Sequence, residues 1–480
     1  MTLNPNAYVP PMGLATNPSF LPPETMGISE TTSTRNYLLQ LLLVGSICGF
    51  IAAASLLTGL IAPGLAVIGV VFVGLTLWRV EMALFLMAGL VPWELQTTFS
   101  REFTAIKAAG ITVAIFGLMK VYVSRGTPWP NMMKYALALG IWSTVSEIFN
   151  IAAPVIPNLL GFAALLSNIA FMYLLMRFCS TPAAFRALLW VVALSSVSAA
   201  AAGLIEYASP AFRAGMAGGR LTTGTNANNY VRYLLSGLFL TPILIASVRS
   251  QLLRLALLPG IVACVAAIVL TGSRGAAIGA AAGGLIMLLF TRRIPAKTRV
   301  GLAIGLAIVA VGAYYFAAQM GAQAVWQKRT AEANIGAASR IRLERWKLAM
   351  SMAAENPVLG VGPGIQEGFE YVRKGYGFTV SHNDVISSLI QGGIPGAICF
   401  VGFLLAGFMG LWRLPPGILR AALLGMWVAF IVTGIFNPSL TKKILWLVAG
   451  ITAAAIVCYG RSGAPATPAP LEEAPVPPQG

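Results

Sequence analysis

The chain has 480 residues, of which 57% are apolar and only 10% are charged, and its mean hydropathy is +0.79. A water-soluble globular protein of this size would lack the polar residues to cover its surface, so we expect an all-α polytopic membrane protein. The net charge of +17 comes from short basic clusters between apolar runs, which argues against nucleic acid as a partner.

Nearly uncharged segments long enough to cross a bilayer recur along the chain. We expect about 12, and at most about 14, transmembrane helices, because some candidates are short or interrupted, as at Pro63 and Pro92. The candidates are 36–57, 60–78, 82–97, 104–123, 133–150, 153–177, 184–206, 230–248, 253–270, 275–290, 299–318, 386–411, 417–436 and 441–459.

These segments divide the chain into transmembrane helices with short loops at 35–318, a large polar loop at 319–385 and C-terminal transmembrane helices at 386–460. Residues 1–34, rich in Pro, Thr and Asn, and the Pro/Ala-rich tail at 461–480 are expected to be disordered. Placing the N-terminus in the cytoplasm puts the basic residues of every alternate loop on the cytoplasmic side. They include Arg35, Arg79, Lys120, Arg177, Arg249, Arg254, Arg413 and Arg420. An even number of spans then leaves both termini in the cytoplasm.

Three arginines break this charge rule on the non-cytoplasmic side. Arg220 and Arg232 flank the stretch GGRLTTGTNANNYVRY, which includes Asn229, and Arg274 lies in TGSRG. An arginine near a helix end can simply extend to the lipid headgroups. Three arginines among Gly, Ser, Thr and Asn instead favour an anion site, because the planar guanidinium group matches phosphate oxygens.

Gly275, Gly279 and Gly283 follow at four-residue spacing. This pattern lets two membrane helices approach closely, so we expect these glycines to pack against a neighbouring helix. Arg274, at the start of the same helix, remains free to face a ligand near the positive end of the helix dipole.

The polar loop contains SRIRLERWKLAMSMAAEN, which predicts an amphipathic helix with Ser339 as its cap and Asn356 at its end. Arg342 and Arg345 share one face of this helix. The same charges are also compatible with an ordinary solvated helix face.

The only histidine, His382, lies in SHND where the loop returns to the membrane, ahead of a helix broken by Gly392, Gly393 and Pro395. A lone histidine is often structural, but breaks at membrane depth usually line a cavity. We therefore predict a catalytic His382, with Asn383 and Asp384 orienting its ring. With one histidine and no close pair of carboxylates on this side, we expect no metal ion and no cofactor.

Four motifs, taken in order, resemble the O-antigen ligase and O-antigen polymerase superfamily of bacterial envelope proteins. They are Arg220 with TGTNANN, TGSRG, the arginine-rich helix ending in ENPVLGVGPG, and SHND with GGIPG. The resemblance runs from about residue 200 to 410, and the first 200 residues share only its hydropathy. It implies a metal-independent, inverting glycosyltransferase of the bacterial inner membrane with a periplasmic active site containing His382, Arg274 and Arg220.

The donor implied by this resemblance is a glycan on undecaprenyl diphosphate, and for a ligase the acceptor is a sugar hydroxyl of lipid A-core in lipopolysaccharide biosynthesis. We favour an O-antigen ligase because the single polar loop with SHND resembles that branch. A repeat-unit polymerase and a protein O-oligosaccharyltransferase remain alternatives. A lipid-linked glycan transporter is the alternative from another class, although the ionisable residues do not collect near the bilayer midplane, as transport sites do.

Overall fold

A computed structural model describes residues 34–40, 42–44, 61–93, 105–123, 129–150, 155–209, 220–222, 226–291, 331–363, 366–377 and 379–460, with isolated positions between 300 and 327. The ends expected to be disordered, most of the candidate span 299–318 and part of 36–57 lie outside the described residues. Within the described ranges the chain is helical and forms no strand.

After the helical residues 34–40 and 42–44, the described part of the chain up to residue 291 contains these elements. They are α2 (Ile61–Trp78), α3 (Val80–Leu90), the 3₁₀ helix η1 (Val91–Trp93), α4 (Ala105–Val123), α5 (Asn131–Phe149), α6 (Val155–Phe178), α7 (Pro182–Ala208), α9 (Ala227–Ser247), α10 (Gln251–Leu270) and α11 (Arg274–Phe290). The remaining elements are α14 (Glu332–Glu355), α15 (Gln366–Arg373), α16 (Asp384–Trp412), α17 (Ile418–Phe436) and α18 (Lys443–Tyr459).

Six helices in the described part of the chain are long and apolar enough to cross a membrane. They are α7, α9, α10, α16, α17 and, from Gly161, α6. Shorter apolar helices occupy Val80–Trp93, Thr112–Val121, Arg274–Phe290 and Lys443–Tyr459. The expected class, an all-α polytopic membrane protein, is confirmed, whereas the total of about 12 to 14 spans remains a prediction.

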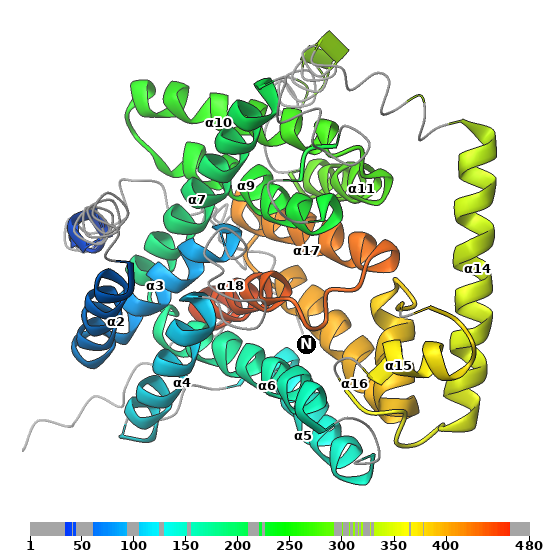
Figure 1. Ribbon diagram of the computed structural model, residues 1–480. Helices are drawn as coiled ribbons and strands as arrows, with labels where there is room; N and C mark the ends of the chain where they lie inside the picture. Colours follow the sequence, from blue (N-terminus) through cyan, green and yellow to red (C-terminus); the bar gives the residue numbers. More distant parts are fainter. Residues whose placement is uncertain are drawn as a thin grey trace, which may run out of the picture.

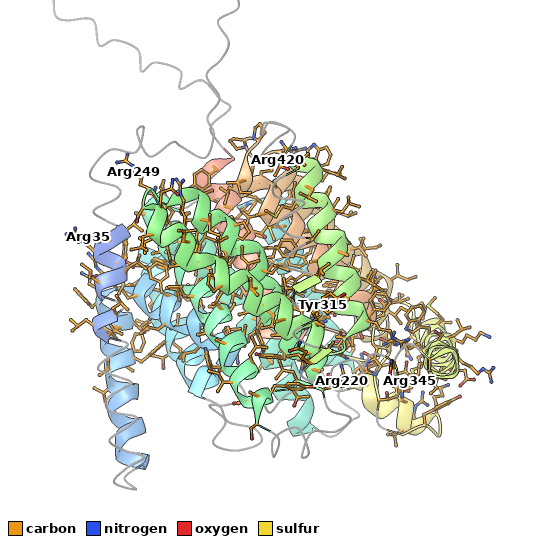
Figure 2. All side chains as sticks on the ribbon, turned by 90° about the horizontal axis from the view of Figure 1, so that it is seen from above. Arg35, Arg220, Arg249, Tyr315, Arg345 and Arg420 are labelled. Carbon is orange, nitrogen blue, oxygen red and sulfur yellow. The ribbon has the colours of Figure 1, made fainter. Side chains whose placement is uncertain are left out.

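The helices form one bundle with α14 standing at its edge and α15 between α14 and α16 (Figure 1). Figure 2 shows that Arg249 and Arg420 lie toward one end of the bundle, whereas Arg220 and Arg345 lie toward the other. At the first end, Arg420 lies over the rings of Phe290 and Trp412. Arg249 and Arg420, which are expected in the cytoplasm, therefore lie toward the opposite end of the bundle from Arg220 and Arg345, which are expected at the site.

The glycines of α11 allow it to lie against α17 with almost no space between the two backbones. A Cβ atom at Gly279 would lie 2.9 Å from the carbonyl oxygen of Ala429, and one at Gly283 would lie 2.3 Å from that of Gly425. A Cβ atom at Gly425 would in turn meet the carbonyl oxygen of Gly283 at 2.6 Å. The predicted packing role of these glycines is confirmed, and the partner helix is α17.

Helix α16 is broken near its start, as the sequence predicts. Gly393 has a φ of 64° and interrupts the helix. The turn that follows α14 supplies the missing hydrogen bonds: Val361 N donates to the carbonyl of Ile390 at 2.8 Å, and Ile394 N donates to that of Pro357 at 2.8 Å. The break in α16 is therefore the point where the polar loop attaches to the bundle.

Helix α5 supports this break from the other side. Trp142 Nε1 donates to the carbonyl of Gly392 at 2.6 Å, and Ser146 Oγ donates to that of Leu359 at 2.6 Å. Backbone carbonyls exposed by the break are thus satisfied within the protein, as a low-dielectric environment requires.

The amphipathic helix of the loop differs from the prediction at its first residue. Helix α14 begins at Glu332, so Ser339 lies inside it and the predicted capping role is wrong. The residues before Ser339 include several alanines, which extend a helix without needing a cap at that point. The predicted end is confirmed, since Asn356 is the C-terminal cap.

Candidate functional site

The TGSRG turn and the stretch after Arg220 meet where α10 ends and α11 begins. Arg220 Nε donates to the carbonyl oxygen of Thr271 at 2.7 Å, and its terminal nitrogen donates to Asn228 Oδ1 at 3.3 Å. Ser273 Oγ also donates to Asn228 Oδ1, at 2.8 Å. The start of α9 and the TGSRG turn therefore form one polar cluster that contains Arg220.

Arg274 is the first residue of α11 and is half-buried. Among the described residues, its guanidinium group has no hydrogen bond or ion-pair partner. The unsatisfied N–H groups at the start of α11 add a partial positive charge beside it. This combination suits an anionic ligand such as a phosphate.

Phe436, the last residue of α17, joins this cluster to the arginine-rich helix α14. A Cβ atom at Gly275 would lie 2.7 Å from Phe436 Cβ, so α11 begins directly against this side chain. The guanidinium carbon of Arg342 lies 5.7 Å from the centre of the same ring, within the range of a cation–π interaction. Phe436 therefore links Arg342 to the TGSRG turn. Nothing in the sequence marks Phe436 as part of the site.

His382 lies between α15 and α16, is half-buried, and adopts a φ of 56°. Burial, followed by the positive charges of Arg345 and Arg342, lowers the pKa of its imidazole below the usual value of 6.5. The ring is therefore neutral at neutral pH and can accept a proton. Trp346 of α14 donates from Nε1 to the carbonyl oxygen of Ser381 at 2.9 Å, so α14 contacts the segment that contains His382.

Asn383 and Asp384 do not orient the imidazole as expected. Asn383 Oδ1 accepts hydrogen bonds from the backbone N–H groups of Val385 and Ile386 and so caps α16. Both Asp384 carboxylate oxygens accept hydrogen bonds from Ser439, and one also accepts the N–H of Leu440 at 3.0 Å. The reason is local: α16 begins at Asp384 with Asn383 as its N-cap, so these two side chains face the helix start and the Ser439 turn.

Arg232 and Asn229 hold the turn between α17 and α18. Arg232 is fully buried and donates to the carbonyl oxygens of Pro438, at 3.0 Å, and Asn437. Asn229 Oδ1 accepts a hydrogen bond from Asn437 Nδ2 at 3.1 Å. The expected contact of Arg232 with a diphosphate is therefore corrected: a guanidinium group enclosed by protein and bonded to two carbonyls supports the turn instead.

The Asn437–Leu440 turn follows α17 and is hydrogen-bonded to α9 through Arg232 and Asn229 and to α16 through Asp384. Sequence analysis missed it because four residues without a charge look like any short connection between two spans. Its Asn-Pro-Ser composition is a turn pattern, but nothing local marks it as the point where Arg232 and Asp384 meet.

An apolar cavity of about 110 Å³ opens beside Asn383 and Asp384. Its walls come from α16, α17 and α18 and include Phe400, Trp427 and Phe430. In the described residues, no group of three or more His, Cys, Asp or Glu side chains is placed to hold a metal ion.

These features define a polytopic membrane protein with histidine and arginine side chains gathered at one end of its helical bundle. Residues 259–401 match the family model described as O-antigen ligase. The match includes Arg274, Arg342, Arg345 and His382, and it supports the O-antigen ligase and polymerase superfamily for this chain. No curated protein matches the chain.

Proposed function

We propose that the chain is an O-antigen ligase, which transfers a glycan from undecaprenyl diphosphate to a sugar hydroxyl of lipid A-core. The observation that carries this proposal is the set of contacts that joins the Arg220 cluster, the TGSRG turn, α14 and the segment with His382. A neutral imidazole beside several guanidinium groups provides a proton acceptor and a diphosphate site together.

The reaction is a single displacement at the anomeric carbon of the first sugar of the donor. The acceptor oxygen forms the new bond to that carbon while the bond from the carbon to the diphosphate oxygen breaks, and its electron pair leaves with the diphosphate. The acceptor hydroxyl gives its proton to an imidazole nitrogen of His382. A positioned base of this kind contributes roughly 10²- to 10⁴-fold to the rate.

Arg274, Arg345, Arg342 and Arg220 hold the diphosphate and balance the charge that grows on it. Each such contact contributes on the order of a few kcal/mol when it is stronger in the transition state than in the ground state. The diphosphate departs as a stable anion, so the leaving group needs no general acid. The low content of carboxylates in the chain, 15 Asp and Glu in 480 residues, is compatible with this chemistry.

The apolar helices around the site support a lipid-linked donor. The apolar cavity beside Asn383 and Asp384 is compatible with an apolar group of the donor lying close to these residues. The charge distribution supports a bacterial inner-membrane location with this end in the periplasm and both termini in the cytoplasm.

Reconstitution of the purified chain with a synthetic undecaprenyl diphosphate-linked oligosaccharide and lipid A-core tests the proposal. Glycosylated lipid A-core is the expected product. Elongation of the donor glycan without transfer to lipid A-core would identify a repeat-unit polymerase, and movement of the donor across the membrane without a new bond would identify a transporter. In cells, loss of a ligase leaves uncapped core on lipopolysaccharide gels, whereas loss of a polymerase leaves core with one repeat unit.

A further inference from the structure

Glu367, on α15, is a buried carboxyl group that the proposed reaction does not use. Its side chain has no exposed surface, although the residue belongs to the polar loop. One carboxylate oxygen accepts the backbone N–H of Ser381 at 2.6 Å, and the other accepts Gln391 Nε2 at 3.2 Å. Burial raises the pKa of this carboxyl group, and the hydrogen bond from the Ser381 backbone is the largest influence in the opposite direction.

Ser381, the residue before His382, is held through every one of its polar atoms. Its N–H is bound by Glu367, and its carbonyl oxygen accepts Trp346 Nε1 at 2.9 Å. Its hydroxyl group lies 2.9 Å from Ser387 Oγ and donates to the carbonyl of Asn383 at 3.2 Å. The peptide that leads into His382 is therefore fixed by α14, α15 and α16 together.

His382 itself has a backbone conformation that needs such support. Its φ of 56° lies in the left-handed region, which is unfavourable for a residue other than glycine and persists where the surroundings fix it. Ser381 fixes one side of the residue and the Asn383 cap of α16 fixes the other. This conformation determines the direction in which the imidazole leaves the backbone.

We propose that Glu367 is a positioning residue for His382. Its carboxyl group acts through the Ser381 peptide to keep the imidazole in the direction needed to accept a proton from the acceptor. The inference rests on the proposed function, because it assumes that His382 is the base. Glu367 does not touch substrate in this account, so its loss should lower kcat and leave the KM for the donor within about twofold.

The test is a double-mutant cycle in the reconstituted glycosyl transfer assay. Glu367→Ala should lower kcat by about 10- to 100-fold, the range expected when a catalytic group is displaced by about 1 Å. In a His382→Ala background the same change should lower the residual rate by less than about twofold, because the group that it positions is gone. The matched control is Glu370→Ala on the same helix, where the carboxylate binds Arg373 near the surface; kcat should be unchanged.

Glu367→Gln serves as a variant of the same size in case Glu367→Ala does not fold. Its amide oxygen can still accept the Ser381 N–H, but its amide nitrogen faces the Gln391 donor, so we expect a smaller loss of kcat that also disappears in the His382→Ala background. Equal losses in both backgrounds, with a lowered unfolding temperature, would assign Glu367 a structural role only and overturn the inference. Wild-type kcat in Glu367→Ala together with an inactive His382→Ala would also overturn it. An active His382→Ala would instead refute the proposed function.

Discussion

Arg220 donates a hydrogen bond from Nε to the carbonyl oxygen of Thr271 at 2.7 Å, across 51 positions of the sequence. This bond ties the stretch before α9 to the turn that presents Arg274. The two arginines are therefore parts of one cluster, and α14 reaches the same cluster through Arg342 and Phe436. The site is assembled from segments that only the folded bundle brings together.

Replacement of Arg274 by lysine keeps the positive charge and removes the planar pair of donors. Because forked recognition of phosphate oxygens needs that plane, we expect kcat/KM to fall by roughly 10-fold or more, about 1.4 kcal/mol of transition-state stabilisation. Steady-state kinetics with a synthetic diphosphate-linked donor measure this. Arg254→Lys, at the opposite end of the bundle, is the control and should behave as wild type. Wild-type kinetics for Arg274→Lys would remove the support for forked recognition there.

The pH dependence of transfer follows from the lowered pKa of His382. A base must be neutral to act, so activity falls as the pH drops through this pKa, and the acid limb of the kcat/KM profile should have its midpoint below pH 6.5. Arg345→Gln removes a positive charge that lowers the pKa, so the midpoint should move to higher pH. Arg340→Gln, on an exposed part of α14, should leave the midpoint in place. A midpoint that does not respond to Arg345→Gln would separate this arginine from the histidine.

The close approach of α11 and α17 predicts different effects for two neighbouring glycines. Gly283→Ala would place a Cβ atom 2.3 Å from the carbonyl oxygen of Gly425, whereas Gly284→Ala meets no atom within 4 Å. We expect the first change to lower stability by on the order of 1–3 kcal/mol, as overpacking does, and the second to be neutral. Thermal unfolding of the purified variants in detergent compares them. Equal unfolding temperatures would show that the two helices are not in backbone contact at Gly283.

The break in α16 offers a second matched pair. Gly393→Ala combines a φ of 64° with a Cβ atom 2.2 Å from the carbonyl oxygen of Val358, while Gly392→Ala makes only an ordinary contact with Trp142. The conformation, with a ψ of −164°, is open almost only to glycine and costs another residue about 1–3 kcal/mol, and the contact adds to it. We expect Gly393→Ala to lower both the unfolding temperature and transfer activity, because the loop that carries His382 attaches at this break. A Gly393→Ala variant as stable and active as Gly392→Ala would rule out this attachment.

Much of the fold follows from local patterns in the sequence. Apolar segment length predicts the membrane helices, and the spacing of Gly275, Gly279 and Gly283 predicts a tightly packed helix face. The spacing does not reveal that α17 is the partner, because the sequence of α11 contains no information on which distant helix lies against it. The start of α14 was misplaced because a favourable capping residue lies within a run that is already helical.

The candidate site was predicted in part. Arg220, Arg274 and His382 stand out in the sequence because charged or titratable side chains are rare in this chain. The structure brings Arg220 to the turn that holds Arg274. Glu367 is one of several acidic residues in the polar loop, and its burial depends on how α15 packs on α16. Asn383 was assigned to the imidazole because it is adjacent in sequence, although its preference for the N-cap position indicated the observed role.

The most direct test of the account is the turnover of His382→Ala with a defined undecaprenyl diphosphate-linked donor and lipid A-core, measured together with binding of the donor. The account predicts a loss of turnover of at least about 10²-fold, since a positioned base contributes that much, with donor affinity retained because the arginines hold the diphosphate. Turnover at the wild-type rate would contradict it.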